Sequence, residues 1–329
     1  MNEPSARFPD HRAFEALKGK EVKRLGQLKA IERKARIYLV RKGNRCCKGS
    51  DGSMFHVLVT TDANYLPPLK VLMHSLFCNN QRPFTFYLLY SRIAEQDLEA
   101  LGEFVRRQGH KLVSIYVDPQ LFCDAPVFRH YTVEMYYRLA AHLFLPPHVE
   151  RVLYLDPDIV AINPIDELYE MDFEGNLFIA AEHTHSTKVA NLFNKLRLKT
   201  PNAKGYFNTG VMMMNVELMR MHVHLADIYQ FIRDHRFKLV LPDQDVVNGL
   251  YWDKIKPVDG YRYNYDARYY DFLQLLPNPK HDLAWIEENT VFIHYCGKEK
   301  PWKDHYKGEL GRFYKRYSQV LELEGEATV

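Results

Sequence analysis

From residue 54 onward, short runs of apolar residues alternate with longer segments in which apolar residues recur at helical spacing. Short apolar runs are typical of buried strands, and their alternation with helices predicts an α/β fold with a mostly parallel sheet covered by helices. We expect strands at residues 56–61, 84–90, 112–117, 152–156, 177–181 and 210–215. We expect helices at residues 66–78, 94–108, 131–143, 187–196 and 216–235.

The first 52 residues have a different pattern. Between residues 14 and 40, apolar side chains recur at spacings compatible with one helix face, with Lys and Arg between them. This pattern predicts a basic amphipathic helix, which a glycine-rich linker at residues 43–52 follows. Such a helix can pack on the protein's own body, lie on an anionic membrane surface or dock on a partner. The sequence leaves all three open.

Charge is unevenly distributed along the chain. The first 52 residues hold 14 Lys/Arg and 6 Asp/Glu, a net charge of +8, whereas the whole 329-residue chain totals +3. The remainder is therefore mildly acidic, at −5. Because the basic arm also lacks alternating arginine and aromatic residues, we expect no nucleic-acid partner.

Composition is that of a soluble globular protein. No apolar run reaches the roughly 18 residues of a membrane span, and the N-terminus lacks the apolar block of a signal peptide. The five cysteines are scattered, without the spacing of a zinc site or a disulfide framework, which fits a reducing compartment. We therefore expect a cytoplasmic protein.

The expected strand at residues 152–156 runs into two carboxylates, Asp156 and Asp158, separated by Pro157. Ligand sites in open α/β sheets lie outside the carboxyl ends of the strands, so this pair is positioned to bind a divalent cation. Asp-Pro-Asp is also good turn sequence, because proline presets φ and aspartates bond nearby backbone. The pair by itself leaves both interpretations open.

Other polar groups follow or interrupt apolar segments. After the first expected strand come Thr60, Asp62, Asn64 and Tyr65. These groups can contact a nucleotide base and ribose, or cap the next helix. Arg138 lies in an apolar, aromatic helix; its planar guanidinium suits a diphosphate, and an ion pair inside the fold is the alternative. No Gly-x-Gly-x-x-Gly or Walker loop follows the first strand, so phosphate binding here would depend on a metal.

Three further polar clusters lie in apolar sequence at residues 205–211, 241–248 and 291–302. The last contains His294 and Lys300. A histidine at the end of an apolar strand is more often a satisfied core residue than a ligand, and a single lysine is more often a surface residue.

Taken in order, these segments resemble glycosyltransferase family 8. The resemblance covers roughly residues 56–302 and rests on Asp-x-Asn-Tyr, Tyr-Arg-Leu, Leu-Tyr-Leu-Asp-x-Asp, Phe-Asn-x-Gly-Val, Asp-Gln-Asp and His-Tyr-x-Gly-x-x-Lys-Pro-Trp. It implies a GT-A fold over residues 53–303, preceded by the basic extension at 1–52 and followed by a basic aromatic helix and tail at 304–329. It also implies retaining transfer of a hexose, galactose or glucose, from a UDP-sugar to a saccharide or glycoconjugate acceptor, with Mn²⁺ or Mg²⁺ as cofactor.

The resemblance also assigns roles to individual residues. It implies that Asp156, Asp158 and His294 ligate Mn²⁺, a donor set that suits an octahedral ion. The residues implied to bind the donor are Thr60, Asp62, Asn64, Tyr65, Arg138, Asp156, Pro157, Asp158, Gly297 and Lys300.

Three further residues are implied to lie at the sugar: Asn208, Asp243 and Gln244. Because glutamine is a poor nucleophile, we expect a front-face substitution without a stable covalent intermediate. The chain departs from the family where an aspartate often contacts the sugar, since it offers Glu182 and His183 there.

Several alternatives remain open at this point. The chain could be a catalytically degenerate sugar-nucleotide-binding protein that acts through a partner. His183 and His185 could suggest a zinc site, although two histidines without further nearby ligands are weak grounds. Residues 185–204 are either a lid over the substrates or an ordinary surface helix and loop. The basic aromatic segment at residues 305–317 could make peripheral membrane contact, as could the basic N-terminus.

Overall fold

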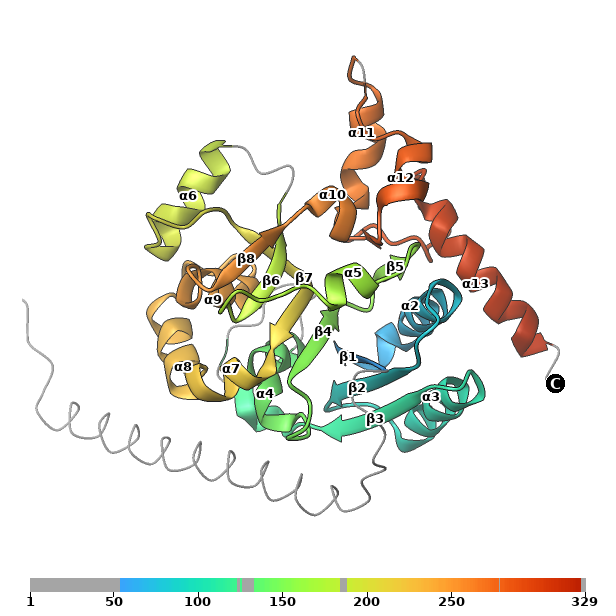
Figure 1. The fold of residues 1–329 in the computed structure, drawn as a ribbon, viewed down its shortest axis with the longest axis horizontal. Helices are drawn as coiled ribbons and strands as arrows, with labels where there is room; N and C mark the ends of the chain where they lie inside the picture. Colours follow the sequence, from blue (N-terminus) through green and yellow to red (C-terminus); the bar gives the residue numbers. More distant parts are fainter. Residues whose placement is uncertain (1–53, 123–124, 126–132, 184–187, 278, 327–329) are drawn as a thin grey trace, which may run out of the picture.

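The computed structural model describes residues 54–122, 125, 133–183, 188–277 and 279–326 (Figure 1). The expected N-terminal helix and linker lie outside these residues, as does His185. In the described part of the chain, no helix is both long and apolar enough to cross a membrane.

A seven-stranded sheet forms the centre of the fold. Its order is β3-β2-β1-β4-β7-β6-β8, and all its strands run parallel except β7. The strands are β1 (Phe55–Thr60), β2 (Phe84–Tyr90), β3 (Lys111–Tyr116), β4 (Arg151–Leu155), β6 (Phe178–Glu182), β7 (Phe207–Asn215) and β8 (Ile255–Val258). All six expected strands are confirmed. The sequence analysis missed β8, a short edge strand with a proline at its third position, a feature that weakens strand patterns.

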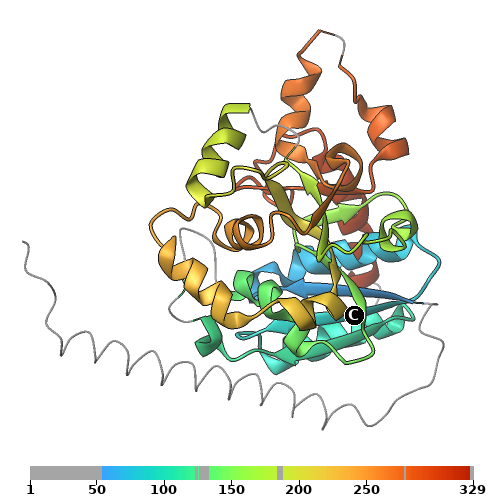
Figure 2. The ribbon, with the colours of Figure 1, turned by 60° about the vertical axis from the view of Figure 1, so that its left-hand side comes forward.

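Helices cover both faces of this sheet (Figure 2). Because side chains alternate along a strand, Val57 and Val59 pack in one core with α2 (Leu66–Asn79) and α3 (Glu95–Arg107). Leu58 packs in the opposite core. The helical elements of that second face are η4 (Val133–Ala140), α4 (Ala141–Phe144), α7 (Val216–His222), α8 (Leu225–Asp234) and α9 (Pro242–Leu250).

Two expected helices are irregular in the structure. The helix expected at residues 131–143 is largely the 3₁₀ segment η4, in which every side chain from residue 134 to 140 is buried. A segment buried on all sides has no polar face to guide an α-helix assignment. The helix expected at 216–235 is wrong as a single helix, because Val223 is extended and buried between α7 and α8.

A second, smaller sheet lies beside the first. Its strands are not among the six expected strands, although the sequence analysis places His294 at the end of an apolar strand. It contains β5 (Ile159–Ala161), β10 (Phe292–His294) and β9 (Tyr265–Asp266), in the order β5-β10-β9. The helices around it are α10 (Gly260–Tyr263), α11 (Tyr270–Gln274), α12 (Leu283–Asn289) and α13 (Gly311–Glu326). Strands of two or three residues are too short to produce a readable period of two.

The second half of the basic aromatic segment at residues 305–317 lies in helix α13. Phe313, Tyr314 and Tyr317 are buried in the core beneath the small sheet, and Tyr317 accepts a hydrogen bond from Asn79 of α2 at 2.8 Å. These three aromatic rings are therefore part of the fold, and peripheral membrane contact through this segment stays a prediction.

Helix α6 (Lys188–Leu198) is confirmed close to its expected position and is anchored by a buried ion pair. Arg197 donates to both carboxylate oxygens of Asp245 in α9, each at 2.6 Å. Asp245 is fully buried and also accepts from the Tyr206 hydroxyl at 2.6 Å and from the backbone N–H groups of residues 240 and 241. This carboxylate ties α6 and two loops to α9.

Loss of the Asp245 charge should destabilise the protein substantially. Removing one partner of a buried pair leaves the other charge uncompensated, which typically costs about 3–5 kcal/mol. We expect Asp245→Asn to lower the free energy of unfolding, measured by urea denaturation, by about that amount. Glu103→Gln removes the exposed partner of Arg107 and should cost less than about 1 kcal/mol. Equal losses in the two variants would contradict the anchoring role.

Candidate active site

The candidate site lies at the carboxyl edge of the central sheet. β1 and β4 are neighbours, although the chain passes through β2 and β3 between them, so the topology reverses at this point. Open α/β sheets bind ligands in the crevice outside such a reversal. β1 leads into Asp62 here, and β4 leads into Asp156. β6 ends here with Glu182, and β7 begins here with Asn208 as its second residue.

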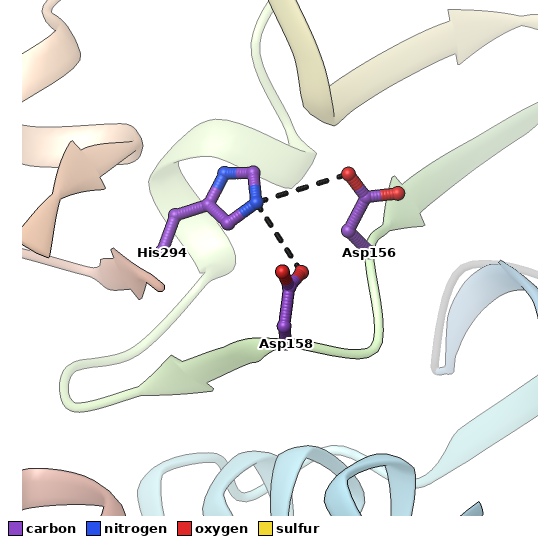
Figure 3. Close-up of side chains that lie close together, drawn as sticks. All are labelled: Asp156, Asp158 and His294. Atoms are coloured by element: carbon purple, nitrogen blue, oxygen red, sulfur yellow. Dashed lines mark ion pairs between the residues drawn. The ribbon is translucent and has the colours of Figure 1, made fainter. Parts of the chain in front are cut away.

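Asp156, Asp158 and His294 converge at this edge (Figure 3). His294 Nε2 lies 3.3 Å from Asp158 Oδ1 and 3.8 Å from Asp156 Oδ2. One ligand atom from each of the three residues lies within 4.8 Å of the other two. Among the described residues, this is the one group of three or more His, Cys, Asp or Glu side chains with that geometry.

The small sheet brings His294 to the carboxylates. β4 ends at Leu155 and β5 begins at Ile159, so the Asp-Pro-Asp segment links the two sheets. In the antiparallel pairing of β5 with β10, His294 is opposite Ile159, and the Tyr295 N–H donates to the carbonyl of Asp158 at 3.0 Å. The Asp-Pro-Asp segment thus turns the chain from one sheet to the other and also presents a pair of carboxylates. The turn interpretation and the paired-carboxylate interpretation of the sequence are therefore compatible.

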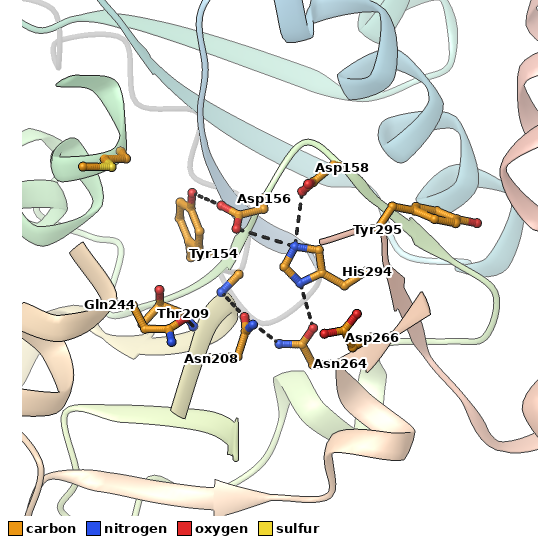
Figure 4. Close-up of polar contacts among 12 residues, drawn as sticks. Tyr154, Asp156, Asp158, Asn208, Thr209, Gln244, Asn264, Asp266, His294 and Tyr295 are labelled. Carbon is orange, nitrogen blue, oxygen red and sulfur yellow. Dashed lines mark hydrogen bonds and ion pairs between the residues drawn. The ribbon is translucent and has the colours of Figure 1, made fainter. Parts of the chain in front are cut away.

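A chain of amides orients the His294 ring (Figure 4). His294 Nδ1 lies 3.0 Å from Asn264 Oδ1, so Nδ1 carries a proton and Nε2 faces the carboxylates. Burial would lower the pKa of His294, but Cys296 and Asp158 raise it, so a bound cation would replace a proton on Nε2. Asn264 Nδ2 donates to Asn208 Oδ1 at 3.0 Å, and that oxygen also accepts from the Gly210 N–H at 2.7 Å. The sequence analysis missed Asn264, because nothing in its local pattern distinguishes it from a turn residue after α10.

The structure fits a divalent cation at this cluster. Two carboxylates and a neutral imidazole nitrogen are suitable ligands for Mn²⁺ or Mg²⁺. Gly210 leaves the necessary room, because a Cβ atom there would lie 2.3 Å from His294 Cε1 and 2.7 Å from Asp156 Oδ2. Burial by itself would raise the pKa of Asp158, but His294 and Lys300 outweigh it and lower that pKa. The Asp158 carboxylate is therefore charged and available.

Arg138 forms the buried ion pair that the sequence left as an alternative. Its Nη2 donates to Asp156 Oδ1 at 2.8 Å, and its Nε lies 3.2 Å from Asp243 Oδ2. Its guanidinium also donates to the Thr209 carbonyl and lies over the Tyr154 ring. The Tyr154 hydroxyl donates to the same Asp156 oxygen at 2.6 Å. These bonds hold Asp156 Oδ1, while Oδ2 faces His294.

Lys300 holds the other carboxylate. Its ammonium donates to Asp158 Oδ2 and, at 2.8 Å, to the Tyr295 carbonyl. Burial would lower the pKa of Lys300, but Asp158 raises it, so the side chain stays charged. Lys300 is only 6% exposed, in contrast to the surface position expected for an isolated lysine.

Asp156, Asp158 and His294 line a cavity of about 240 Å³. Twelve of the expected site residues line it together with His294: Thr60, Asp62, Tyr65, Arg138, Asp156, Pro157, Asp158, Asn208, Asp243, Gln244, Gly297 and Lys300. Asn64 does not line it; this residue is exposed, and its backbone N–H donates to Asp62 Oδ1 at 2.9 Å. Asp62 therefore caps the short helix that follows β1, as one interpretation of the sequence had it. The sequence analysis missed Glu134, Arg268 and Cys296 in the lining.

Comparison with known proteins decides the family. The model of glycosyl transferase family 8 matches residues 56–306, about three quarters of the chain. The chain belongs to this family.

Relatives and solved structures agree with the family and the fold. A lipopolysaccharide 1,2-glucosyltransferase of Escherichia coli is 25% identical over 81% of the chain and 78% of its own length. A lipopolysaccharide 1,3-galactosyltransferase of Salmonella typhimurium is 25% identical over 77% and 74%. The galactosyltransferase LgtC, crystallised with donor and acceptor sugar analogs, superposes with a TM-score of 0.68 at 22% identity, over 81% of this chain and 96% of LgtC. An active-site mutant of LgtC superposes with a TM-score of 0.71. The fold is therefore GT-A.

Removing the amide that orients His294 should weaken metal binding. Partners that orient a metal-binding histidine typically contribute about 10–100-fold in affinity. We expect Asn264→Ala to weaken Mn²⁺ binding by that factor, measured from the EPR signal of free Mn²⁺. Asn163→Ala is the control, because Asn163 bonds only backbone carbonyls at residues 287 and 290. Unchanged Mn²⁺ affinity in Asn264→Ala would contradict the role of Asn264.

Proposed function

We propose that this glycosyltransferase is a retaining hexosyltransferase that moves galactose or glucose from a UDP-sugar to a saccharide or glycoconjugate acceptor, with Mn²⁺ or Mg²⁺ as cofactor. The observation that carries the proposal is the Asp156, Asp158 and His294 cluster beside the buried cation Lys300, in a cavity at the carboxyl edge of β1 and β4. The names of the relatives, glucosyl- and galactosyltransferases, support a hexose.

The leaving-group side of the cavity supplies positive charge. Asp156, Asp158 and His294 would hold the cation, which when bound supplies Lewis-acid stabilisation of charge on the departing diphosphate. Lys300 adds a fixed positive charge at the same place. Gly297 has a φ of +84°, a conformation that L side chains rarely adopt, and so turns the backbone beside Lys300. We place the diphosphate of the donor against this wall.

The nucleoside would lie where β1 ends. Thr60, Asp62 and Tyr65 line the cavity there, and we assign to them contacts with the base and ribose. Asn64, which is exposed outside the cavity, remains a prediction as a donor contact. Tyr65 lies near both Lys300 and Trp302, so the nucleoside and diphosphate walls are continuous.

The opposite wall would hold the transferred sugar. Gln244 is fixed, since its Nε2 lies 2.9 Å from His183 Nε2 and its Oε1 accepts from the Thr209 N–H at 3.3 Å. Asp243 is buried and paired with Arg138. An amide held in this way, beside a carboxylate engaged in an ion pair, can orient and stabilise the sugar but is a poor nucleophile. A front-face substitution is therefore the mechanism we favour.

Of the two residues that replace the family's usual aspartate, His183 lines this cavity and Glu182 does not. We infer that His183 contacts the donor sugar. Burial lowers the pKa of His183 to about 4, so the ring is neutral near pH 7 and offers a hydrogen bond rather than a charge. A zinc site at His183 remains unsupported, because His185 lies outside the described residues.

The alternative function is a degenerate member that binds a sugar nucleotide without transferring it. The complete set of Asp156, Asp158, His294 and Lys300 argues against it, because each group that the transfer requires on the leaving-group side is present. We also propose a cytoplasmic location and no nucleic-acid partner, on the composition alone.

Donor hydrolysis tests the proposal directly. With Mn²⁺ and no acceptor, we expect slow hydrolysis of UDP-glucose or UDP-galactose in a screen that also includes their N-acetyl forms. Asp158→Asn should reduce that rate by roughly 100-fold or more, since it removes a metal ligand and a partner of Lys300. Asp253→Asn, which changes an exposed aspartate remote from the cavity, should leave the rate unchanged. Hydrolysis of no UDP-sugar, or full activity in Asp158→Asn, would contradict the proposal.

A further inference from the structure

Large apolar side chains are exposed together on the second half of α6 and on the loop at residues 235–241, which joins α8 to α9. They are Leu192, Phe193, Leu196, Phe237 and Val240. Single exposed apolar residues are common, whereas a group of large ones marks an interaction site. We propose that this group, here called the α6–loop surface, docks the protein on a lipid bilayer that carries anionic headgroups. The proposal goes beyond the proposed function and does not depend on it.

Buried bonds hold the helix and the loop side by side. Arg197 of α6 donates to the Lys238 carbonyl at 2.7 Å and to the carboxylate of Asp245. The same carboxylate accepts from the Val240 N–H at 2.6 Å. Both segments are therefore fixed to one buried ion pair, and the apolar side chains that flank it belong to one surface.

The apolar side chains lie on the outside of this junction. Leu192 and Leu196 are one turn apart on α6, and Phe193 is three positions before Leu196, so the three share one side of the helix. All three are more than half exposed, and Phe237 on the loop is 97% exposed. Helix α6 lies at the periphery of the molecule in both views (Figures 1 and 2). An almost fully exposed phenylalanine gains little from packing in the fold, but its ring can be buried in a bilayer.

The α6–loop surface is also basic. Residues 188–204 and 235–241 contain no Asp or Glu. The basic side chains that are exposed or half-exposed on the second half of α6, just after it and on the loop are Lys195, Lys199, Arg236 and Lys238. Arg233 and Asp234, just before the loop, cancel each other's charge. Positive charge is thus concentrated here, although residues 53–329 as a whole have a net charge of −5.

This combination of charge and apolar side chains suits an anionic bilayer. Each Lys or Arg near an anionic membrane surface strengthens binding by roughly fivefold. Phe and Leu side chains enter the boundary between the headgroups and the acyl chains. Nucleic acids are instead bound by aromatic stacking combined with positive charge, and three of the five apolar side chains here are aliphatic.

Charge argues against two other occupants of the surface. The basic helix expected at residues 14–40 carries its own Lys and Arg, and a second copy of the chain would present the same basic surface. Either would bring like charges together, which disfavours binding.

A second exposed apolar group offers an internal comparison. It lies on α11 and contains Phe272, Leu275 and Leu276. Residues 269–279 include no Lys or Arg, so this group lacks the attraction to anionic headgroups that the α6–loop surface has. We therefore expect the two groups to behave differently toward anionic vesicles.

The α6–loop surface adjoins the candidate active site. Leu241, the residue after Val240, lines the cavity, as do Asp243 and Gln244 in the first turn of α9. A bilayer docked on this surface would therefore lie next to the cavity and hold it near the level of the headgroups.

Vesicle binding by the full chain tests the proposal. We measure co-sedimentation with vesicles of phosphatidylcholine alone, and of phosphatidylcholine with about one third phosphatidylglycerol. Phe237→Glu and Leu196→Glu disrupt the apolar part of the surface, and Leu275→Glu makes the same change on α11, where Leu275 is 83% exposed. Arg236→Gln removes one charge from the surface, and Arg107→Gln removes one from an exposed position on α3.

Wild type should bind the anionic vesicles at least about tenfold more tightly than the neutral ones. Phe237→Glu and Leu196→Glu should each lose at least about tenfold in binding, and Arg236→Gln about fivefold. Leu275→Glu and Arg107→Gln should stay within about twofold of wild type. A loss in Arg236→Gln without one in Phe237→Glu would indicate an acidic partner bound by charge alone, and would overturn the bilayer as the occupant.

A variant that gains a signal keeps the test independent of misfolding. Phe237→Trp should add a fluorescence component that shifts to the blue on anionic vesicles, whereas the component added by Leu275→Trp should not shift. A wild type that does not bind, undiminished binding in Phe237→Glu and Leu196→Glu, or an unshifted Phe237→Trp component would contradict the proposal. Since no readout uses a sugar nucleotide, these outcomes are separate from those that test the transferase function.

Discussion

Two carboxylates held side by side in a partly buried site repel each other, and the organisation of this protein around its cavity follows from how that repulsion is offset. Asp156 and Asp158 each have a cation of their own: Arg138 from η4 for the first and Lys300 for the second. Lys300 lies 142 positions further along the chain than Asp158. Buried charges are stable only when paired and hydrogen-bonded. The pairing of these two carboxylates therefore links the central sheet to the 3₁₀ segment through Arg138, and to the loop before α13 through Lys300. The small sheet is linked to the same carboxylates through His294.

The same arrangement prepares the site for a dissociable cation and an anionic ligand. The fixed cations occupy the outer sides of the carboxylate pair, Arg138 on Asp156 Oδ1 and Lys300 on Asp158 Oδ2, while the remaining oxygens face His294 Nε2. The amide chain through Asn264 and Asn208 sets the ring. Because Asn208 also lines the cavity, the amide chain that orients His294 reaches the proposed donor space. The proposed metal site and the proposed donor site therefore share hydrogen-bonded residues.

The sequence predicted the central sheet well and the site only in outline. Strands buried on both faces are continuous apolar runs, so β1, β2 and β4 were readable, whereas β5, β9 and β10 are too short to show a period. Yet β10 is the strand that brings His294 to Asp158. Spacing along the chain could not pair residues 136 positions apart, and only the family resemblance did so. Asn264 and the Asp266–Arg268 pair were missed for the same reason, since their roles exist only once the small sheet has formed.

The most direct test of this organisation is the dependence of UDP binding on a divalent cation, measured by calorimetry with Mn²⁺ and again in excess EDTA. If the carboxylates and His294 hold a cation that carries the diphosphate, UDP affinity should fall at least about tenfold in EDTA, a change of about 1.4 kcal/mol or more. Returning Mn²⁺ or Mg²⁺ should restore it. Equal UDP affinity with Mn²⁺ and in EDTA would contradict the assignment of this cluster as the metal-dependent centre of the donor site.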